Sequence, residues 1–183
     1  MEWNGPDVML QQLNRKQSEA KVFLCNATTG DSKRIYEEKS DTWIDIIPTQ
    51  GNGWRWINSG KEFLWISEKD GWRHLYRIAA NGEKETVITK GDYDMISLKA
   101  VDEKSGYVYF MASPTNATQQ YLYRTMLNGK GKLELLSPGD QQGTHSYTLS
   151  PTGQYGNHNF SNHKNQRVME WVSFPGHKTI RET

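Results

Sequence analysis

The sequence predicts an all-β fold, and three observations carry the prediction. Four short sequence markers recur along the chain at intervals of 46 to 48 residues. The chain contains 16 glycines and 21 aromatic side chains (seven Trp, nine Tyr and five Phe), but no long alanine- or leucine-rich stretch typical of a helix. Because each aromatic side chain buries a large area, the aromatics offset a hydrophobic content of only 35% and argue against disorder.

The clearest marker is an apolar run, Glu62–Ser67, which recurs at residues 107–113 and more weakly at residues 154–161. The other markers keep their order and their phase along the chain, so chance is a poor explanation. They are Leu75-Tyr76-Arg77 and Leu122-Tyr123-Arg124, Asn81-Gly82 and Asn128-Gly129, and the turn dipeptides Ser59-Gly60, Ser105-Gly106 and Thr152-Gly153.

Each marker predicts one element of a four-stranded repeat. The Ser-Gly or Thr-Gly pair predicts a tight turn, because Gly supplies positive φ, and the apolar run after it predicts an inner strand covered on both faces. The polar residues 68–71 then turn the chain into the Leu-Tyr-Arg strand. The Asn-Gly pair predicts a type I′ hairpin, since both residues tolerate positive φ, and it leads into outer strands at residues 85–89 and 132–137.

Four short antiparallel strands per repeat are typical of a β-propeller blade. We expect blades at residues 41–91, 92–139 and 140–183, and the remainder of another blade at residues 1–39. The chain is therefore predicted to be a partial propeller of between three and four blades. Closed propellers have about four to eight blades, so this segment would leave two aromatic-rich faces exposed. Such a segment could form a homodimer or adopt a nonring arrangement.

Charge and cysteine content exclude several functional classes. A net charge of +1 gives no basic field for nucleic acid or anionic lipid. We expect no membrane span and no signal peptide, because no stretch is long and apolar enough and the first residues lack a basic segment. Cys25 stands alone, which excludes an internal disulfide and a cysteine-based zinc cluster. Neither phosphate-cradling glycine motif occurs, and we expect no cofactor.

Histidines and serines give no catalytic pattern. The Gly-x-Ser-x-Gly motif of many serine hydrolases does not occur. His158 and His163 lie five residues apart and could hold a metal, but the polar run around them favours a solvated loop or turn, and we expect no metal site. His74 is interpreted as a structural hydrogen-bonding residue.

Two further patterns have a functional and a structural interpretation. Trp54 and Trp56 flank Arg55 and could stack on sugars or bases, but at a spacing of two on a strand they share one face and more simply pack between blades. The adjacent carboxylates at residues 37–38 and 102–103 could bind an amine or act in acid–base chemistry. Both pairs have a lysine neighbour beside a predicted turn, which favours solvated turn charges.

The passage Phe63-Leu64-Trp65-Ile66-Ser67-Glu68-Lys69-Asp70-Gly71-Trp72-Arg73-His74-Leu75-Tyr76 resembles a stretch of the dipeptidyl peptidase IV family of serine exopeptidases. The later order of Thr89-Lys90-Gly91, residues 93–101 and residues 106–110 is also similar, as is the strand at residues 8–15. The likeness covers essentially all 183 residues and is specific at residues 62–77.

The resemblance implies an eight-bladed amino-terminal propeller followed by an α/β-hydrolase domain with a Ser-Asp-His triad. Family members release an N-terminal X-Pro or X-Ala dipeptide, and the propeller gates peptide access. A glutamate pair that binds the substrate amine is expected before Met1, so it is not transferred to Glu37-Glu38. A substrate-orienting arginine would fall at residues 48–53, where this sequence has none.

These likenesses lead to one main hypothesis and one alternative. The main hypothesis is a noncatalytic propeller portion of a periplasmic or extracellular peptidase, inactive alone and partnered by the hydrolase domain of the same polypeptide and its peptide substrates. No catalytic residue is assigned, and substrate-binding residues stay unknown. The alternative is a TolB-like periplasmic propeller scaffold that binds protein partners.

Overall fold

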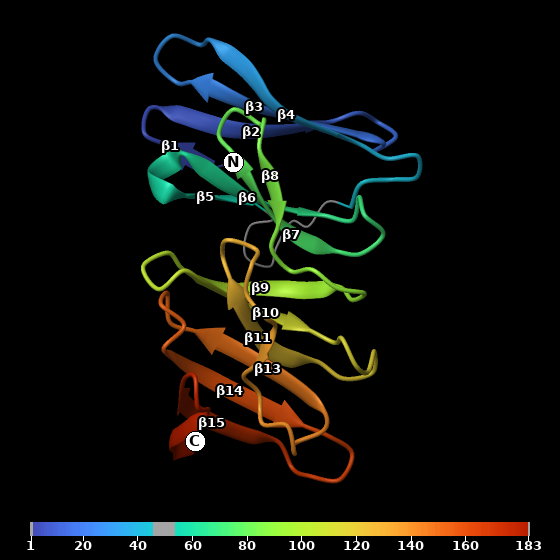
Figure 1. Ribbon diagram of the computed structural model, residues 1–183, viewed down its shortest axis with the longest axis vertical. Coiled ribbons are helices and arrows are strands. Elements are labelled where there is room, and N and C mark those ends of the chain that lie inside the picture. The colour runs from blue at the N-terminus through green and yellow to red at the C-terminus, as the bar shows by residue number, and fades with distance from the viewer. Residues whose placement is uncertain (1, 46–53, 183) are drawn as a thin grey trace. The chain divides into compact units, whose positions relative to one another are not determined.

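The chain forms four antiparallel sheets of four strands each in the computed structural model, which describes residues 2–45 and 54–182 (Figure 1). In every sheet the hydrogen-bonded neighbours are also neighbours along the chain, which is the order of a propeller blade. The predicted all-β class is confirmed. In these residues the one helical element is the 3-10 turn Asn58–Gly60, and no helix there could cross a membrane.

Two compact units divide the chain, Met1–Val87 and Ile88–Thr183, and each contains two sheets. The strands of the first unit are β1 (Glu2–Asn4), β2 (Asp7–Leu13), β3 (Glu19–Asn26) and β4 (Ser32–Lys39), then β5 (Trp54–Ile57), β6 (Glu62–Ser67), β7 (His74–Ala79) and β8 (Glu85–Val87). The strands of the second unit are β9 (Met95–Asp102), β10 (Tyr107–Ala112), β11 (Tyr121–Met126) and β12 (Glu134–Leu135), then β13 (Thr144–Leu149), β14 (Tyr155–Ser161), β15 (Val168–Ser173) and β16 (Lys178–Glu182).

Each unit has its own hydrophobic core, formed between its two sheets. In the first unit, residues of β2 to β4 pack against residues of β6 and β7; the buried set is Met9, Val22, Ile35, Phe63, Trp65, Tyr76 and Ile78. In the second unit, β9 to β11 pack against β13 and β15; the buried set is Ala100, Tyr109, Met111, Leu122, Leu136, Tyr147 and Val172. The aromatic residues of the repeat thus fill the space between adjacent blades.

The sequence markers take the positions predicted for them, with two corrections. The Asn-Gly turns are not type I′, because only Gly82 and Gly129 have positive φ (80° and 70°) and the preceding asparagines do not. Asn81 and Asn128 instead accept backbone hydrogen bonds through Oδ1 from the residues two positions later. The outer strands are also shorter than predicted, Glu85–Val87 and Glu134–Leu135.

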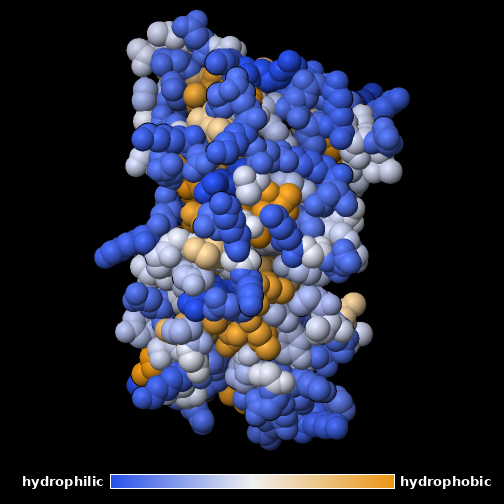
Figure 2. Space-filling model, viewed as in Figure 1, coloured by the Kyte–Doolittle hydropathy of each residue, from blue (hydrophilic) through white to orange (hydrophobic). Residues whose placement is uncertain are grey.

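The surface is mostly hydrophilic on the face shown in Figure 2, and apolar residues show between the polar ones in small groups. Several large apolar side chains are exposed in the described residues, among them Trp3 (61%) and Ile180 (59%). Exposed apolar residues are normal on globular domains. Polar groups deep in the cores are the more informative feature.

Candidate functional site

A row of buried polar side chains crosses the last sheet. His145 and His158 have no exposed surface, and Glu170 is 6% exposed. The strand register places Tyr147 of β13 opposite His158 of β14, and His158 opposite Glu170 of β15. Because paired residues point to the same face of a sheet, these three side chains lie side by side on the core-facing side.

A continuous hydrogen-bond chain runs along this row. The Nε2 of His145 donates to the backbone oxygen of Gln141 at 2.8 Å. The Nδ1 of His145 lies 2.9 Å from Nε2 of His158, and Nδ1 of His158 lies 2.8 Å from Oε1 of Glu170. The hydroxyl of Thr179 donates to the second oxygen of Glu170 at 2.6 Å. Both oxygens of the buried carboxylate are therefore bound.

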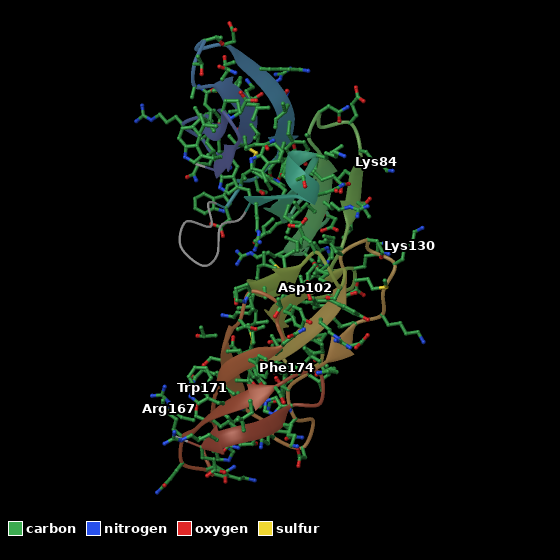
Figure 3. All side chains as sticks on the ribbon, turned by 90° about the vertical axis from the view of Figure 1, so that its left-hand side faces the viewer. Lys84, Asp102, Lys130, Arg167, Trp171 and Phe174 are labelled. Atoms are coloured by element: carbon green, nitrogen blue, oxygen red, sulfur yellow. The ribbon has the colours of Figure 1, made fainter. Side chains whose placement is uncertain are left out.

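His177 joins this row from the turn between β15 and β16. Its Nε2 lies 2.9 Å from the hydroxyl of Tyr147, whose ring stacks on His158 with centroids 4.4 Å apart. The rings of His158 and His177 meet edge to face at 4.7 Å. Phe174, labelled in Figure 3, covers Tyr147 edge-on at 5.8 Å. We call His145, Tyr147, His158, Glu170 and His177 the histidine cluster.

Burial favours neutral imidazoles in the histidine cluster. Loss of solvation lowers the pKa of His145 to about 4, and it also lowers the pKa of His158 and of His177. Burial alone would raise the pKa of Glu170, but hydrogen bonds from Thr179 and His158 outweigh it, and the net shift of that pKa is downward. Burial thus makes the three rings weaker bases, whereas the hydrogen bonds to Glu170 favour the charged form of its carboxyl group.

The hydrogen-bond chain lacks one hydrogen if both imidazoles are neutral. Three contacts link Gln141, His145, His158 and Glu170, and each contact needs one hydrogen. Two neutral imidazoles supply only two hydrogens, because each carries a single N–H. The third contact is satisfied only if a proton, or another cation, lies between His158 and Glu170 or is shared along the chain. Such a charge would also neutralise the buried carboxylate.

These residues include a group with the chemistry of metal ligands. Ligand atoms of His158, Glu170 and His177 all lie within 4.8 Å of one another. Imidazole nitrogen and carboxylate oxygen suit zinc and related transition metals. Ser137, which adjoins the cluster, is 4% exposed, and its Oγ accepts hydrogen bonds from Tyr147 and from the backbone of Leu122. It is therefore no accessible nucleophile.

The sequence interpretation of the histidines is partly wrong. His158 is not in a solvated loop; it is fully buried on β14, because it takes the core-facing position between Gly156 and Phe160. His163 lies in the exposed loop that follows, as predicted. The real neighbours of His158, which are Glu170 and His177, were not singled out. The alternation of inward and outward positions along β13 and β14 is the sequence signal that would place His158 in the core, since His145 and Tyr147 also occupy inward positions.

Glu38 also differs from its prediction. It is 7% exposed, not a solvated turn charge, because β4 continues through it and directs it toward β6. Its oxygens accept hydrogen bonds from Trp65 Nε1 at 2.7 Å and Ser67 Oγ at 2.6 Å. A pocket of about 150 Å³ adjoins it, lined in part by Trp43, Asp45 and Glu68. Glu37, by contrast, forms surface ion pairs.

The remaining candidates have structural roles. Asp102, labelled in Figure 3, accepts hydrogen bonds from Ser105 and from the backbone of Lys104, so it caps the turn after β9. It is nevertheless nearly buried at 9% exposure, so it is not the solvated charge predicted. His74 is buried and bonds Asp70 at 2.8 Å, as its structural interpretation predicts.

The tryptophan pair lies within the first unit. Trp54 and Trp56 pack against the core between its two sheets, which confirms packing over ligand stacking. The segment at residues 48–53, where the family arginine would fall, lies outside the described residues.

Comparison with known proteins gives one consistent result. The family model described as "Dipeptidyl peptidase IV (DPP IV) N-terminal region" matches residues 1–167. The dipeptidyl peptidase 4 of Arthroderma otae is 28% identical over 150 residues, which are 81% of this chain and 19% of that protein. The enzyme of the same name from Trichophyton rubrum is 28% identical over 127 residues, 67% of this chain and 16% of its own.

A solved structure shows the same fold. The crystal structure of Porphyromonas gingivalis dipeptidyl peptidase 4 superposes with a TM-score of 0.83 at 23% sequence identity. The match covers 97% of this chain and 24% of that chain. The chain therefore spans about a quarter or less of the length of these three relatives.

Proposed function

Because the chain belongs to the family of dipeptidyl peptidase IV N-terminal regions, we propose that it is the noncatalytic propeller portion of a serine peptidase that releases N-terminal X-Pro or X-Ala dipeptides. The match over residues 1–167 is the observation that carries this proposal. It covers the first three sheets and the first two strands of the fourth, β13 and β14, so the likeness is not confined to one blade.

In this proposal the propeller selects substrates by size. Within each unit the two blades share a packed hydrophobic core, which holds them rigidly together. A rigid ring of blades can admit an extended peptide while it excludes a folded protein. The partners are then peptide substrates and a hydrolase domain of the same polypeptide. The ring would be eight-bladed, as the family resemblance implies, and the protein would act in the periplasm or outside the cell.

Catalysis in this proposal lies outside the 183 residues. Ser137, which hydrogen-bonds Tyr147 of the histidine cluster, is buried. The triad, the acyl-enzyme intermediate and the oxyanion hole would come from the hydrolase domain.

The test of this proposal is to express an extended protein, in which this chain is continued by the coding sequence that follows it. We expect a Gly-x-Ser-x-Gly segment within a few hundred codons, followed by an Asp and a His. The extended protein should cleave a chromogenic Gly-Pro dipeptide and a short X-Pro peptide, but should not remove the same dipeptide from the N-terminus of a stably folded protein. Replacing the motif serine by alanine should abolish cleavage and leave expression unchanged.

Two results would contradict the proposal. If no such motif follows, or if the extended protein binds a protein partner without cleaving peptides, the TolB-like scaffold replaces it. If folded and unfolded X-Pro substrates are cleaved at equal rates, the peptidase assignment stands but size selection by the propeller does not.

A further inference from the structure

We propose that His158, Glu170 and His177 form a binding site for a divalent transition metal ion of the zinc class. The site lies in the last sheet and its β15–β16 turn, and it serves to hold these two elements together. It is independent of peptide cleavage, because none of its residues has a role in the proposed catalytic chemistry.

The first argument is the type and placement of the ligands. Two imidazoles and one carboxylate offer ligand atoms that all lie within 4.8 Å of one another. In a tetrahedral site with metal–ligand bonds of about 2.0–2.1 Å, neighbouring ligand atoms are about 3.3 Å apart. The present distance of 2.8 Å between His158 Nδ1 and Glu170 Oε1 would have to widen by about half an ångström. The wider separations, up to 4.8 Å, would have to close by as much as about 1.5 Å, and His177 is the least buried of the three ligands.

The second argument is the missing positive charge. With a metal ion between His158 Nδ1 and Glu170 Oε1, the count of hydrogens is correct for neutral imidazoles. His158 then donates from Nε2 to Nδ1 of His145, and His145 donates from Nε2 to Gln141. Each N–H has an acceptor and no two lone pairs face each other. Binding would release the single shared proton to solvent.

The third argument is the support around the ligands. Metal-bound histidines commonly donate their other N–H to a fixed acceptor, and ligating carboxylates are themselves hydrogen-bonded. Here the second nitrogen of His158 is held through His145 by a backbone carbonyl. The second oxygen of Glu170 is held by Thr179 at 2.6 Å. These supports fix the two buried ligands in one orientation.

The fourth argument is the backbone of His177. Its φ is 46°, in the left-handed region that residues with a side chain rarely adopt. Glycine would fit this position without steric cost, so the backbone does not require a histidine, although histidine adopts this region more often than most residues do. Strain of this kind is a pointer to a role for the side chain. His177 is only partly buried, so its turn also gives an ion a route to the two buried ligands.

The test measures Zn²⁺ binding to the full 183-residue chain after treatment with a chelator. Competition with a chromogenic zinc indicator should give one Zn²⁺ per chain with a dissociation constant of about 1 µM or below, and proton release on binding. Two variants remove a ligand: His177→Gly, which suits the local φ and should fold, and Glu170→Gln, which keeps the bond to Thr179. Each should weaken binding by about 100-fold or more.

His163→Ala is the matched control, because His163 lies in an exposed loop of the same sheet. It should change zinc affinity less than about twofold. Circular dichroism in the absence of zinc shows whether each variant is folded. In ¹⁵N spectra, the ring nitrogens of His158 and His177 should shift with zinc in the wild-type chain, and those of His163 should not.

The proposal is overturned if the folded chain binds no Zn²⁺ at micromolar concentrations, in which case the shared charge is a proton only. It is also overturned if His177→Gly binds as tightly as the wild-type chain. If Glu170→Gln fails to fold, the folded His177→Gly variant and the ring-nitrogen spectra decide the question.

Discussion

The indole of Trp65 donates a 2.7 Å hydrogen bond from Nε1 to Oε2 of Glu38, and this bond joins the two sheets of the first unit. Ser67 donates to the other oxygen of the same carboxylate at 2.6 Å and accepts a bond from the backbone of Lys69. The buried carboxylate is therefore the meeting point of β4, β6 and the turn that follows β6. This contact is polar, but it lies beside the hydrophobic core that the same two sheets form.

Replacing Glu38 by alanine should destabilise the chain by about 2–4 kcal/mol, because Trp65 Nε1 and Ser67 Oγ would lose their acceptor inside the protein. The free energy of unfolding, taken from urea titrations followed by tryptophan fluorescence, measures the effect. Glu37→Ala is the control: Glu37 pairs with Arg34 and Lys39 at the surface, and its loss should cost less than about 1 kcal/mol. Equal losses for the two variants would contradict the structural role of Glu38.

Gly82 permits a close approach between the two sheets of the first unit. A Cβ at this position would lie 1.7 Å from the backbone oxygen of Ile35, whereas a Cβ at Gly30 would meet nothing within 4 Å. Both glycines have nearly the same positive φ, 80° and 79°.

We therefore expect Gly30→Ala to cost about 1 kcal/mol, from backbone strain alone. Gly82→Ala should cost about 1–3 kcal/mol more, because the sheets must move apart. Thermal and urea unfolding of the two variants measure the difference. If both substitutions cost the same, the approach of Gly82 to Ile35 is not present in solution.

Tyr93 should ionise late. Burial, and to a smaller degree the neighbouring Tyr123, raise the pKa of Tyr93 to about 12 from a usual value of 10.0. A raised pKa means that folding favours the neutral phenol, so this contribution to stability is complete below pH 10 and is lost as the pH rises from 10 toward 12.

The difference in phenolate absorbance between wild type and Tyr93→Phe isolates this group from the other buried tyrosines. Its midpoint should lie near pH 12 in the folded chain and near pH 10 in urea. A midpoint near 10 in the folded chain would show that Tyr93 is solvated.

The repeat predicted the parts of the fold that recur. Leu75 and Leu122, 47 residues apart, are both fully buried. Arg77 and Arg124, which follow them by two positions, pair with glutamates on different strands: Arg77 with Glu62 of the preceding strand at 3.4 Å, and Arg124 with Glu134 of the following strand at 2.7 Å. Position within a blade determines which side chains face the core, so the periodic markers predict four-stranded sheets and their inward faces, but not the ion-pair partners at the surface.

The histidine cluster could not be predicted in the same way, because it is not periodic. His145, His158 and His177 come from two strands and a turn, and the register of β13, β14 and β15 places His158 between Tyr147 and Glu170. A polar residue in a core-facing position also lowers the apolar signal of its strand, so His158 resembled part of a loop. The burial of Glu38 could not be predicted either, because its partners, Trp65 and Ser67, lie 27 and 29 residues away in the next sheet.

Peptidase activity of the purified 183-residue chain tests the central claim most directly. The measurement is hydrolysis of a chromogenic Gly-Pro substrate, with the dipeptidyl peptidase 4 of Porphyromonas gingivalis as positive control and a serine-reactive inhibitor in parallel samples. If the chain is a noncatalytic propeller portion, it should hydrolyse the substrate no faster than a sample without protein. Turnover that copurifies with the folded chain and disappears with the inhibitor would contradict it, because a catalytic serine would then lie within these 183 residues.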